Sequence, residues 1–176
     1  MKKILISCLS VALLASCKKE VTELPGATQT GANTFGAKIN GIFWAPQGFG
    51  PFPANDILEA RMSGHDITIN ARNFSSSPNE TEFQLTIYNV FVPGTYLLNT
   101  YVIHPNGAAS YGYYVKRNFT PDNEWLTSST YTGRVIITRI DDVNMIVSGT
   151  FEFNAGSIYN ADVISVTEGR FDVKIQ

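Results

Sequence analysis

Apolar and polar residues alternate with a period of two through much of this chain, and this alternation limits the folds open to it. In EFQLTIYNVF, one face of the segment is formed by every second residue, namely Phe83, Leu85, Ile87, Asn89 and Phe91. The same period recurs at Val135 and Ile137, and again at Phe171, Val173 and Ile175. Such alternation is typical of antiparallel sheets that are buried on one side. No stretch has a sustained helical period, so we expect an all-β chain.

Turn-forming residues separate these runs at short intervals. Asn40-Gly41 suits a two-residue hairpin loop, because both residues tolerate a positive φ. Ser63-Gly64 and Pro93-Gly94 mark further breaks, and the segment 141–144 joins two strong strands. Roughly nine or ten strands at this spacing predict a single antiparallel β-sandwich. A closed β-barrel is the alternative, because a period of two does not distinguish closure from stacking.

The N-terminus has the layout of a secretory signal. Lys2 and Lys3 precede an apolar run that is too short to cross a bilayer, which needs about 20 apolar residues. Leu14-Ala15-Ser16-Cys17 resembles the lipobox of bacterial lipoproteins, in which a peptidase cuts before the cysteine and lipid is attached to its sulfur. We therefore expect Cys17 to be lipidated and to anchor the chain in a membrane; an ordinary signal peptide is the alternative.

The anchor limits both the chemistry of the mature chain and its location. Cys8 leaves with the signal, so no cysteine other than Cys17 remains for disulfides, thiol catalysis or metal binding. Lys18, rather than an aspartate, follows Cys17, which favours the outer membrane over the inner one. The sequence leaves open whether the domain faces the periplasm or lies on the cell surface.

Composition divides the chain into three parts. Residues 1–16 are the expected signal peptide, 17–33 the lipidated cysteine with a flexible tether, and 34–176 the β-sandwich domain. The tether is polar and rich in small residues, and its 16 residues after Cys17 could span about 50 Å. Removing Lys2 and Lys3 leaves 11 basic against 15 acidic residues, a net charge of about −4. A mildly acidic chain without a basic stripe argues against nucleic-acid binding.

Two segments at the ends of the domain carry a family resemblance. TGANTFGAKINGIFWAP, and VSGTFEFNA followed by VTEGRFDVKI, resemble a family of uncharacterised lipoproteins from Bacteroidetes that is described as a domain of unknown function. The resemblance implies export, anchoring and a β-rich fold, and it assigns no catalytic residue. Within these motifs, Gly149 and Gly169 interrupt strands and predict bulges or a close approach of the backbone.

Aromatic residues in Gly/Pro-rich loops are the strongest indication of a binding surface. The segment 43–53 carries four rings, and further rings occur at 111–114 and at Trp125. Such rings stack on sugars or bind partner proteins. The alternative is that they close one end of the core. The candidate ligand-binding residues are Trp44, Phe49, Phe52, Tyr113 and Trp125.

No catalytic or metal-binding motif stands out. GxSxG is absent, and His65 and His104 have no companion ligands at metal-binding spacing, so we expect no metal and no cofactor. Asp141 and Asp142 fit a hairpin turn better than a catalytic pair. The remaining carboxylates that could form a glycosidase pair are Glu59, Glu80, Glu82, Asp122, Glu124 and Glu152.

These observations favour a non-enzymatic module. The leading hypothesis is an outer-membrane lipoprotein that binds a glycan or an envelope protein through aromatic loops. The alternative is a small envelope or polysaccharide hydrolase whose acidic pair is brought together by folding. A purely structural envelope protein, with all its rings in the core, is a third possibility.

Overall fold

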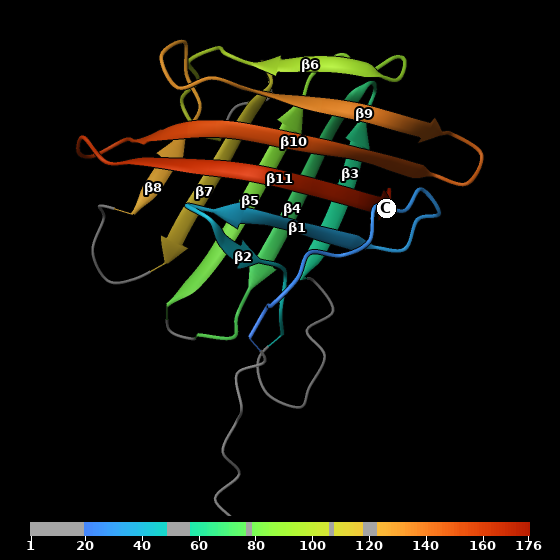
Figure 1. Cartoon of the computed structure of the whole chain (residues 1–176). Helices are drawn as coiled ribbons and strands as arrows, with labels where there is room; N and C mark the ends of the chain where they lie inside the picture. Colours follow the sequence, from blue (N-terminus) through green and yellow to red (C-terminus); the bar gives the residue numbers. More distant parts are fainter. Residues whose placement is uncertain (1–19, 49–56, 77–78, 106–107, 118–122) are drawn as a thin grey trace, which may run out of the picture.

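The computed structural model describes residues 20–48, 57–76, 79–105, 108–117 and 123–176 (Figure 1). Within these residues the chain forms eleven strands and no helix. The strands are β1 (Thr34–Ile39), β2 (Ile42–Trp44), β3 (Leu58–Ser63), β4 (Asp66–Asn73), β5 (Glu80–Ile87), β6 (Gly94–Leu98), β7 (Tyr111–Arg117), β8 (Glu124–Leu126), β9 (Gly133–Asp141), β10 (Ile146–Ser157) and β11 (Val163–Lys174).

The strands form one antiparallel sheet with two layers. The first layer has the order β2-β1-β11-β10-β9-β6, and the second has the order β8-β7-β5-β4-β3. β10 joins the layers, because it pairs with β9 along most of its length and with β8 at its end, where Gly156 lies opposite Leu126. Figure 1 shows the strands of the two layers crossing at a steep angle.

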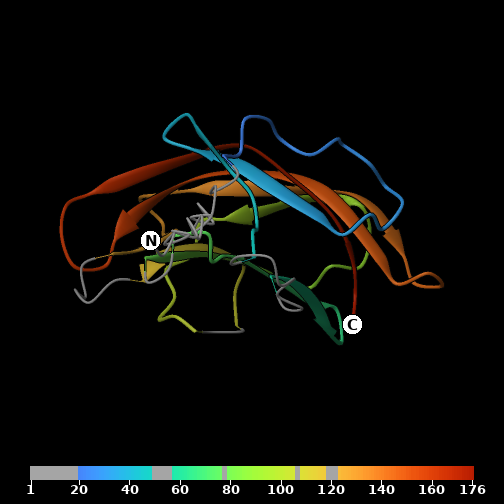
Figure 2. The ribbon, with the colours of Figure 1, turned by 90° about the horizontal axis from the view of Figure 1, so that it is seen from below.

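The two layers also meet at the opposite side. The amide of Gln176 donates to the carbonyl of Ala60 in β3 at 2.9 Å, and Gln47 bridges Asn73 at the end of β4. Figure 2 shows the first layer arching over the second, so that the sheet is curled into a half-barrel. The predicted all-β antiparallel fold is confirmed, and it combines the facing layers of a sandwich with the continuous sheet of a barrel.

The core fills the space between the layers with residues from the predicted apolar faces. Phe83, Leu85 and Ile87 of β5 are fully buried. The Phe83 ring lies 5.7 Å from that of Phe35 in β1, and the Phe35 ring lies 5.1 Å from that of Phe151 in β10. This chain of rings links both layers, so the aromatic content stabilises the fold directly.

The predicted strand face was wrong for Asn89 and Phe91. β5 ends at Ile87, and Asn89 has a φ of 56°, which turns the chain and changes the direction of the following side chains. Val90 is buried in their place, whereas Phe91 is 62% exposed with its ring 4.0 Å from that of His65. A left-handed residue thus ended the alternation, and Asn is among the residues that tolerate this conformation.

The turn and bulge predictions agree with the structure. Asn40 and Gly41 have φ values of 49° and 82° and join β1 to β2 in a two-residue hairpin. A Cβ on Gly149 would lie 2.4 Å from the carbonyl oxygen of Ile136, and one on Gly169 would lie 2.5 Å from the Phe151 ring. The β-ladder register shifts beside both glycines. These positions therefore require glycine.

The N-terminal segment before β1 lies against the outer face of the first layer. Residues 28–33 were expected to belong to a flexible tether, whereas Thr28, Thr30, Gly31 and Ala32 all donate hydrogen bonds to Asp172 of β11. We call residues 25–33 the strap. The strap begins at Pro25, whose ring packs closely against β1. A Cβ on Gly36 of β1 would lie only 2.6 Å from this ring.

Candidate functional site

The structure places Trp44 in the core. Trp44 ends β2 and is 7% exposed, and its ring packs edge-on against Phe83 at 4.7 Å. Its indole Nε1–H donates to the Thr81 hydroxyl at 2.8 Å. A buried ring whose polar atom is already bonded is a structural element and offers no face to a ligand.

Trp125 and Tyr113 are also covered. Trp125 of β8 is 5% exposed, and its ring lies 5.8 Å from that of Tyr114, with the Lys116 ammonium 5.6 Å from its centre. Tyr113 of β7 is 5% exposed and stacks on His104 at 3.7 Å with nearly parallel rings. The remaining candidates, Phe49 and Phe52, and the lipidation residue Cys17 lie outside the described residues.

A polar cluster surrounds Tyr113 on the outer face of the second layer. The Tyr113 hydroxyl donates to Glu124 at 2.9 Å. Gln84 Oε1 lies 2.8 Å from His104 Nε2 and accepts from the Tyr111 hydroxyl at the same distance. Because that oxygen is an acceptor, His104 Nε2 is the protonated nitrogen of the ring. We call these five residues the tyrosine cluster.

Burial controls the titration of the tyrosine cluster. Desolvation lowers the pKa of His104, and the nearby carboxylates of Glu124 and Glu82 oppose this change. Burial and the hydrogen bond to Glu124 raise the pKa of Tyr113 well above its usual value. Both rings are therefore neutral near pH 7. The cluster covers the outer face of β7.

Two of the carboxylates that could form a glycosidase pair, Glu82 and Glu124, lie on either side of β7. Glu82 of β5 and Glu124 of β8 both lie opposite Val115 of β7, on the same face of the sheet. Their backbones are therefore roughly 10 Å apart, because neighbouring strands are about 4.8 Å apart. Glu82 pairs with Arg117 at 2.7 Å and with Arg72 at 3.6 Å. These bonds give Glu82 a structural role.

The aspartates have structural partners as well. Asp141 accepts from the backbone and side-chain nitrogens of Asn144, both at 2.9 Å, and this closes the β9–β10 turn as predicted. These bonds, with Arg139, hold the pKa of Asp141 well below its usual range. Asp172 alternates with the apolar Phe171 and Val173 of β11, yet it is only 1% exposed, because the strap covers it. No local signal identifies it, because its donors in the strap are about 140 residues away in the sequence.

The outer face of the first layer is open beyond the strap. Two adjoining hollows of about 270 and 410 Å³ lie over β9, β10 and β11 on either side of the Arg134–Glu152 ion pair. We call them together the outer groove. Its polar lining residues are Thr132, Arg134, Thr150, Glu152, Asn154, Ser165, Thr167, Glu168 and Arg170.

The lining charges of the outer groove cancel. Arg134 and Arg170 stand against Glu152 and Glu168, and the other polar groups are hydroxyls and one amide. Arg134 and Glu152 are 2.6 Å apart and both about half exposed. This surface is not evident from the sequence, because its residues come from three strands whose pairing register a period of two does not reveal.

Metal ligands do not gather in the described part of the chain. Among these residues, no group of three or more His, Cys, Asp or Glu side chains could hold a metal ion. The same residues include no helix that is long and apolar enough to cross a membrane.

Comparison with known proteins places the chain in a family. Residues 32–173 match a family described as Domain of unknown function (DUF6252). This range runs from the end of the strap to β11, and it contains the whole outer groove apart from Ala27. No curated protein and no solved structure matched the chain. The chain therefore belongs to the DUF6252 family, as the match over residues 32–173 shows.

Proposed function

We propose that this protein is an exported, lipid-anchored and non-enzymatic module that binds a glycan in the outer groove. The observation that carries the proposal is the lining of that groove, where paired charges, hydroxyls and an amide face solvent over three adjacent strands. The carboxylates Asp141, Asp172 and Glu82 are already bonded to structural partners.

The lining favours a neutral ligand that is rich in hydroxyls. Cancelling charges give the outer groove no preference for a cation or an anion, so recognition depends on hydrogen bonds. Arg134 and Glu152 offer fixed donors and acceptors to vicinal hydroxyls. A volume of about 410 Å³ in the larger hollow is in the range of small-ligand sites.

A protein partner fits this surface less well. Stable protein interfaces are centred on aromatic or similar apolar anchors in the middle of the contact. Phe151 and Phe153 line the outer groove, but both are buried and their rings pack against Phe83 in the core. Phe49 and Phe52 stay predicted contacts for a larger ligand.

The proposed location follows from the N-terminal sequence. The apolar run and Leu14-Ala15-Ser16-Cys17 support export and lipidation at Cys17, with the outer membrane as the destination. Cys17→Ala would move the protein from the membrane to the soluble fraction of the cells, whereas Cys8→Ala would leave it in the membrane. Equal membrane retention of both variants would contradict the lipid anchor.

Glycan binding is tested with the full chain on an array of neutral and acidic oligosaccharides. We expect binding to neutral members, and Arg134→Ala should weaken it by about tenfold or more through the loss of charge-assisted hydrogen bonds. Arg61→Ala is the matched control, because Arg61 is an exposed arginine of β3 that pairs with Glu59 on the other layer. Equal binding by both variants, or no neutral glycan bound, would contradict the proposal.

The hydrolase is the second candidate, because Glu82 and Glu124 face the same side across Val115. A separation of about 6.5–9.5 Å between carboxyl groups is the arrangement of inverting glycosidases. Sugar release from a polysaccharide that disappears in both Glu82→Gln and Glu124→Gln, but not in Arg134→Ala, would favour this candidate over the binding module.

A further inference from the structure

One buried carboxylate, that of Asp172, accepts four hydrogen bonds from the strap. Asp172 Oδ2 accepts from the Thr28 hydroxyl at 2.6 Å and from the amides of Thr30 and Ala32 at 2.9 and 3.1 Å. Asp172 Oδ1 accepts from the amide of Gly31 at 2.8 Å and from the Ser148 hydroxyl at 2.8 Å. Four of these five donors come from the strap, so the carboxylate binds the strap as one unit.

The charge of Asp172 persists despite its burial. Burial alone raises the pKa of this carboxyl group, but the donors of Thr28, Ala32, Ser148 and Thr30 outweigh it and hold the pKa well below the usual range. The carboxylate is therefore ionised at any pH that the cell envelope meets, and its hydrogen bonds are of the stronger, charge-assisted kind.

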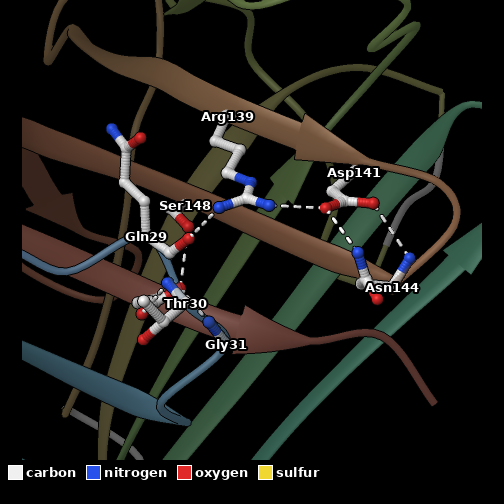
Figure 3. A network of polar contacts seen from close by, with 8 residues as sticks. Gln29, Thr30, Gly31, Arg139, Asp141, Asn144 and Ser148 are labelled. Atoms are coloured by element: carbon white, nitrogen blue, oxygen red, sulfur yellow. Dashed lines mark hydrogen bonds and ion pairs between the residues drawn. The ribbon is translucent and has the colours of Figure 1, made fainter.

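Independent contacts fix the strap on both sides of Asp172. Figure 3 shows Arg139 of β9 between the carbonyl of Gln29 and the carboxylate of Asp141. Asn33 Oδ1 accepts from the amide of Lys174 at 2.9 Å. Gly31 has a φ of 71°, and a Cβ there would lie 2.9 Å from the Ile146 side chain, so the strap fits closely against β10.

The strap also forms one wall of the outer groove. Ala27 lines the smaller hollow, and Arg170 of the same hollow donates to the carbonyl of Pro25 at 3.4 Å. The groove and the first residue of the strap are thus in direct contact. In Figure 1 the described chain begins beside β1 and β2, on the side of the molecule opposite β6.

We infer that the Asp172 carboxylate is a latch that holds the outer groove close to the membrane. The inference rests on the proposed lipid anchor at Cys17. Only the seven residues 18–24 separate Cys17 from the strap, and even fully extended they span at most about 25 Å. A free segment of 16 residues would span about 50 Å. The groove therefore samples ligands near the lipid surface, and release of the strap would add about 30 Å of reach and remove one wall.

The latch is tested first by hydrogen exchange on the full chain in lipid vesicles. We expect the amides of Thr30, Gly31 and Ala32 to exchange as slowly as those of β11, and Asp172→Asn to speed their exchange by about tenfold or more. Asp66→Asn is the matched control, because the Asp66 carboxylate accepts from the amide of Asn89 on the second layer and makes no contact with the strap among the bonds of the described residues. Fast exchange in the native protein, or equal effects of both variants, would overturn the latch.

The distance to the membrane is tested by energy transfer from a dye at Thr150→Cys to an acceptor lipid in the same vesicles. We expect Asp172→Asn to lower the transfer efficiency and Asp66→Asn, on the second layer, to leave it unchanged. An unchanged efficiency in Asp172→Asn, with faster exchange of the strap, would overturn the membrane-proximal groove.

The same variants separate the latch from the anchor. Cys17→Ala should abolish energy transfer by releasing the protein, yet leave the slow exchange of the strap unaltered. Loss of vesicle binding thus reports the anchor, whereas exchange at residues 30–32 reports the latch alone. Binding to the oligosaccharide array reports the groove in a third, separate measurement.

Discussion

The two layers of the sheet present outer faces that are covered in different ways. On the second layer, His104 stacks on Tyr113, and Gln84 and Glu124 have their partners within the tyrosine cluster. On the first layer, the strap covers Asp172 at one end, and the outer groove leaves Arg134 and Glu152 about half exposed. Polar residues at equivalent strand positions thus become structural where a segment covers them and remain available to a ligand where none does.

The largest expected change in stability compares the hydrogen bonds that hold the strap with those of an exposed turn. Asp172→Ala leaves four strap donors and the Ser148 hydroxyl without their acceptor, so we expect the free energy of unfolding to fall by about 3 kcal/mol. Urea denaturation measures this change. Asp141→Ala should give a smaller loss, since the β9–β10 turn is open to water. A loss for Asp172→Ala no greater than that of Asp141→Ala would show that the covered end of the first layer is not structural.

The strap also shows where sequence reasoning stopped. The all-β fold, the Asn40-Gly41 hairpin and the glycine bulges are local properties, and alternation and turn chemistry predict them. Asp172 occupies a polar position in a regular alternation, and residues 28–33 are small and polar. Nothing within either segment indicates that they meet. Their pairing depends on a register across about 140 residues, which a single sequence does not reveal.

The positions of the aromatic residues were also not predicted by the sequence. Trp44, Tyr113 and Trp125 occur near glycine and proline, a composition that is typical of exposed loops. The structure buries all three: Trp44 and Trp125 lie in the core that the curled sheet encloses, and Tyr113 lies on the outer face of the second layer beneath His104. The amino-acid composition gives the number of aromatic rings, but it does not indicate on which side of the sheet each ring lies.

The second prediction tests the closed tyrosine cluster. Tyr113→Phe removes a buried hydroxyl that donates to Glu124, and we expect the free energy of unfolding to fall by about 1 kcal/mol. Tyr159→Phe is the matched control, because the Tyr159 hydroxyl donates to the same carboxylate at 3.2 Å from an exposed position. Thermal or urea unfolding of both variants gives the comparison. Equal losses would mean that burial of the cluster does not strengthen its bonds.

A third and smaller effect is the pH dependence of the second layer. Burial lowers the pKa of His104 below the ordinary value of 6.5, so the unfolded chain binds a proton more readily than the folded one. The stability from neutral His104 is complete above pH 6.5 and is lost as the pH falls through the lowered value. We expect His104→Gln to reduce the change of the unfolding free energy with pH below pH 6.5, as measured by urea unfolding at several pH values. A slope that persists in His104→Gln would assign it to other groups.

The smallest effect on stability is expected at the outer groove itself. Arg134 and Glu152 are both about half exposed, so Arg134→Ala should change the free energy of unfolding by no more than about 0.5 kcal/mol. Arg117→Ala on the second layer should cost more, about 1 kcal/mol, because its partner Glu82 is largely buried and would be left with the longer contact to Arg72 at 3.6 Å. Urea unfolding of the two variants measures the difference.

An ion pair that adds little to stability and lines a groove can bind a ligand without a loss of stability. If Arg134→Ala proved as destabilising as Arg117→Ala, the first layer would be held by its surface charges in the same way as the second, and the contrast between the two faces would be lost.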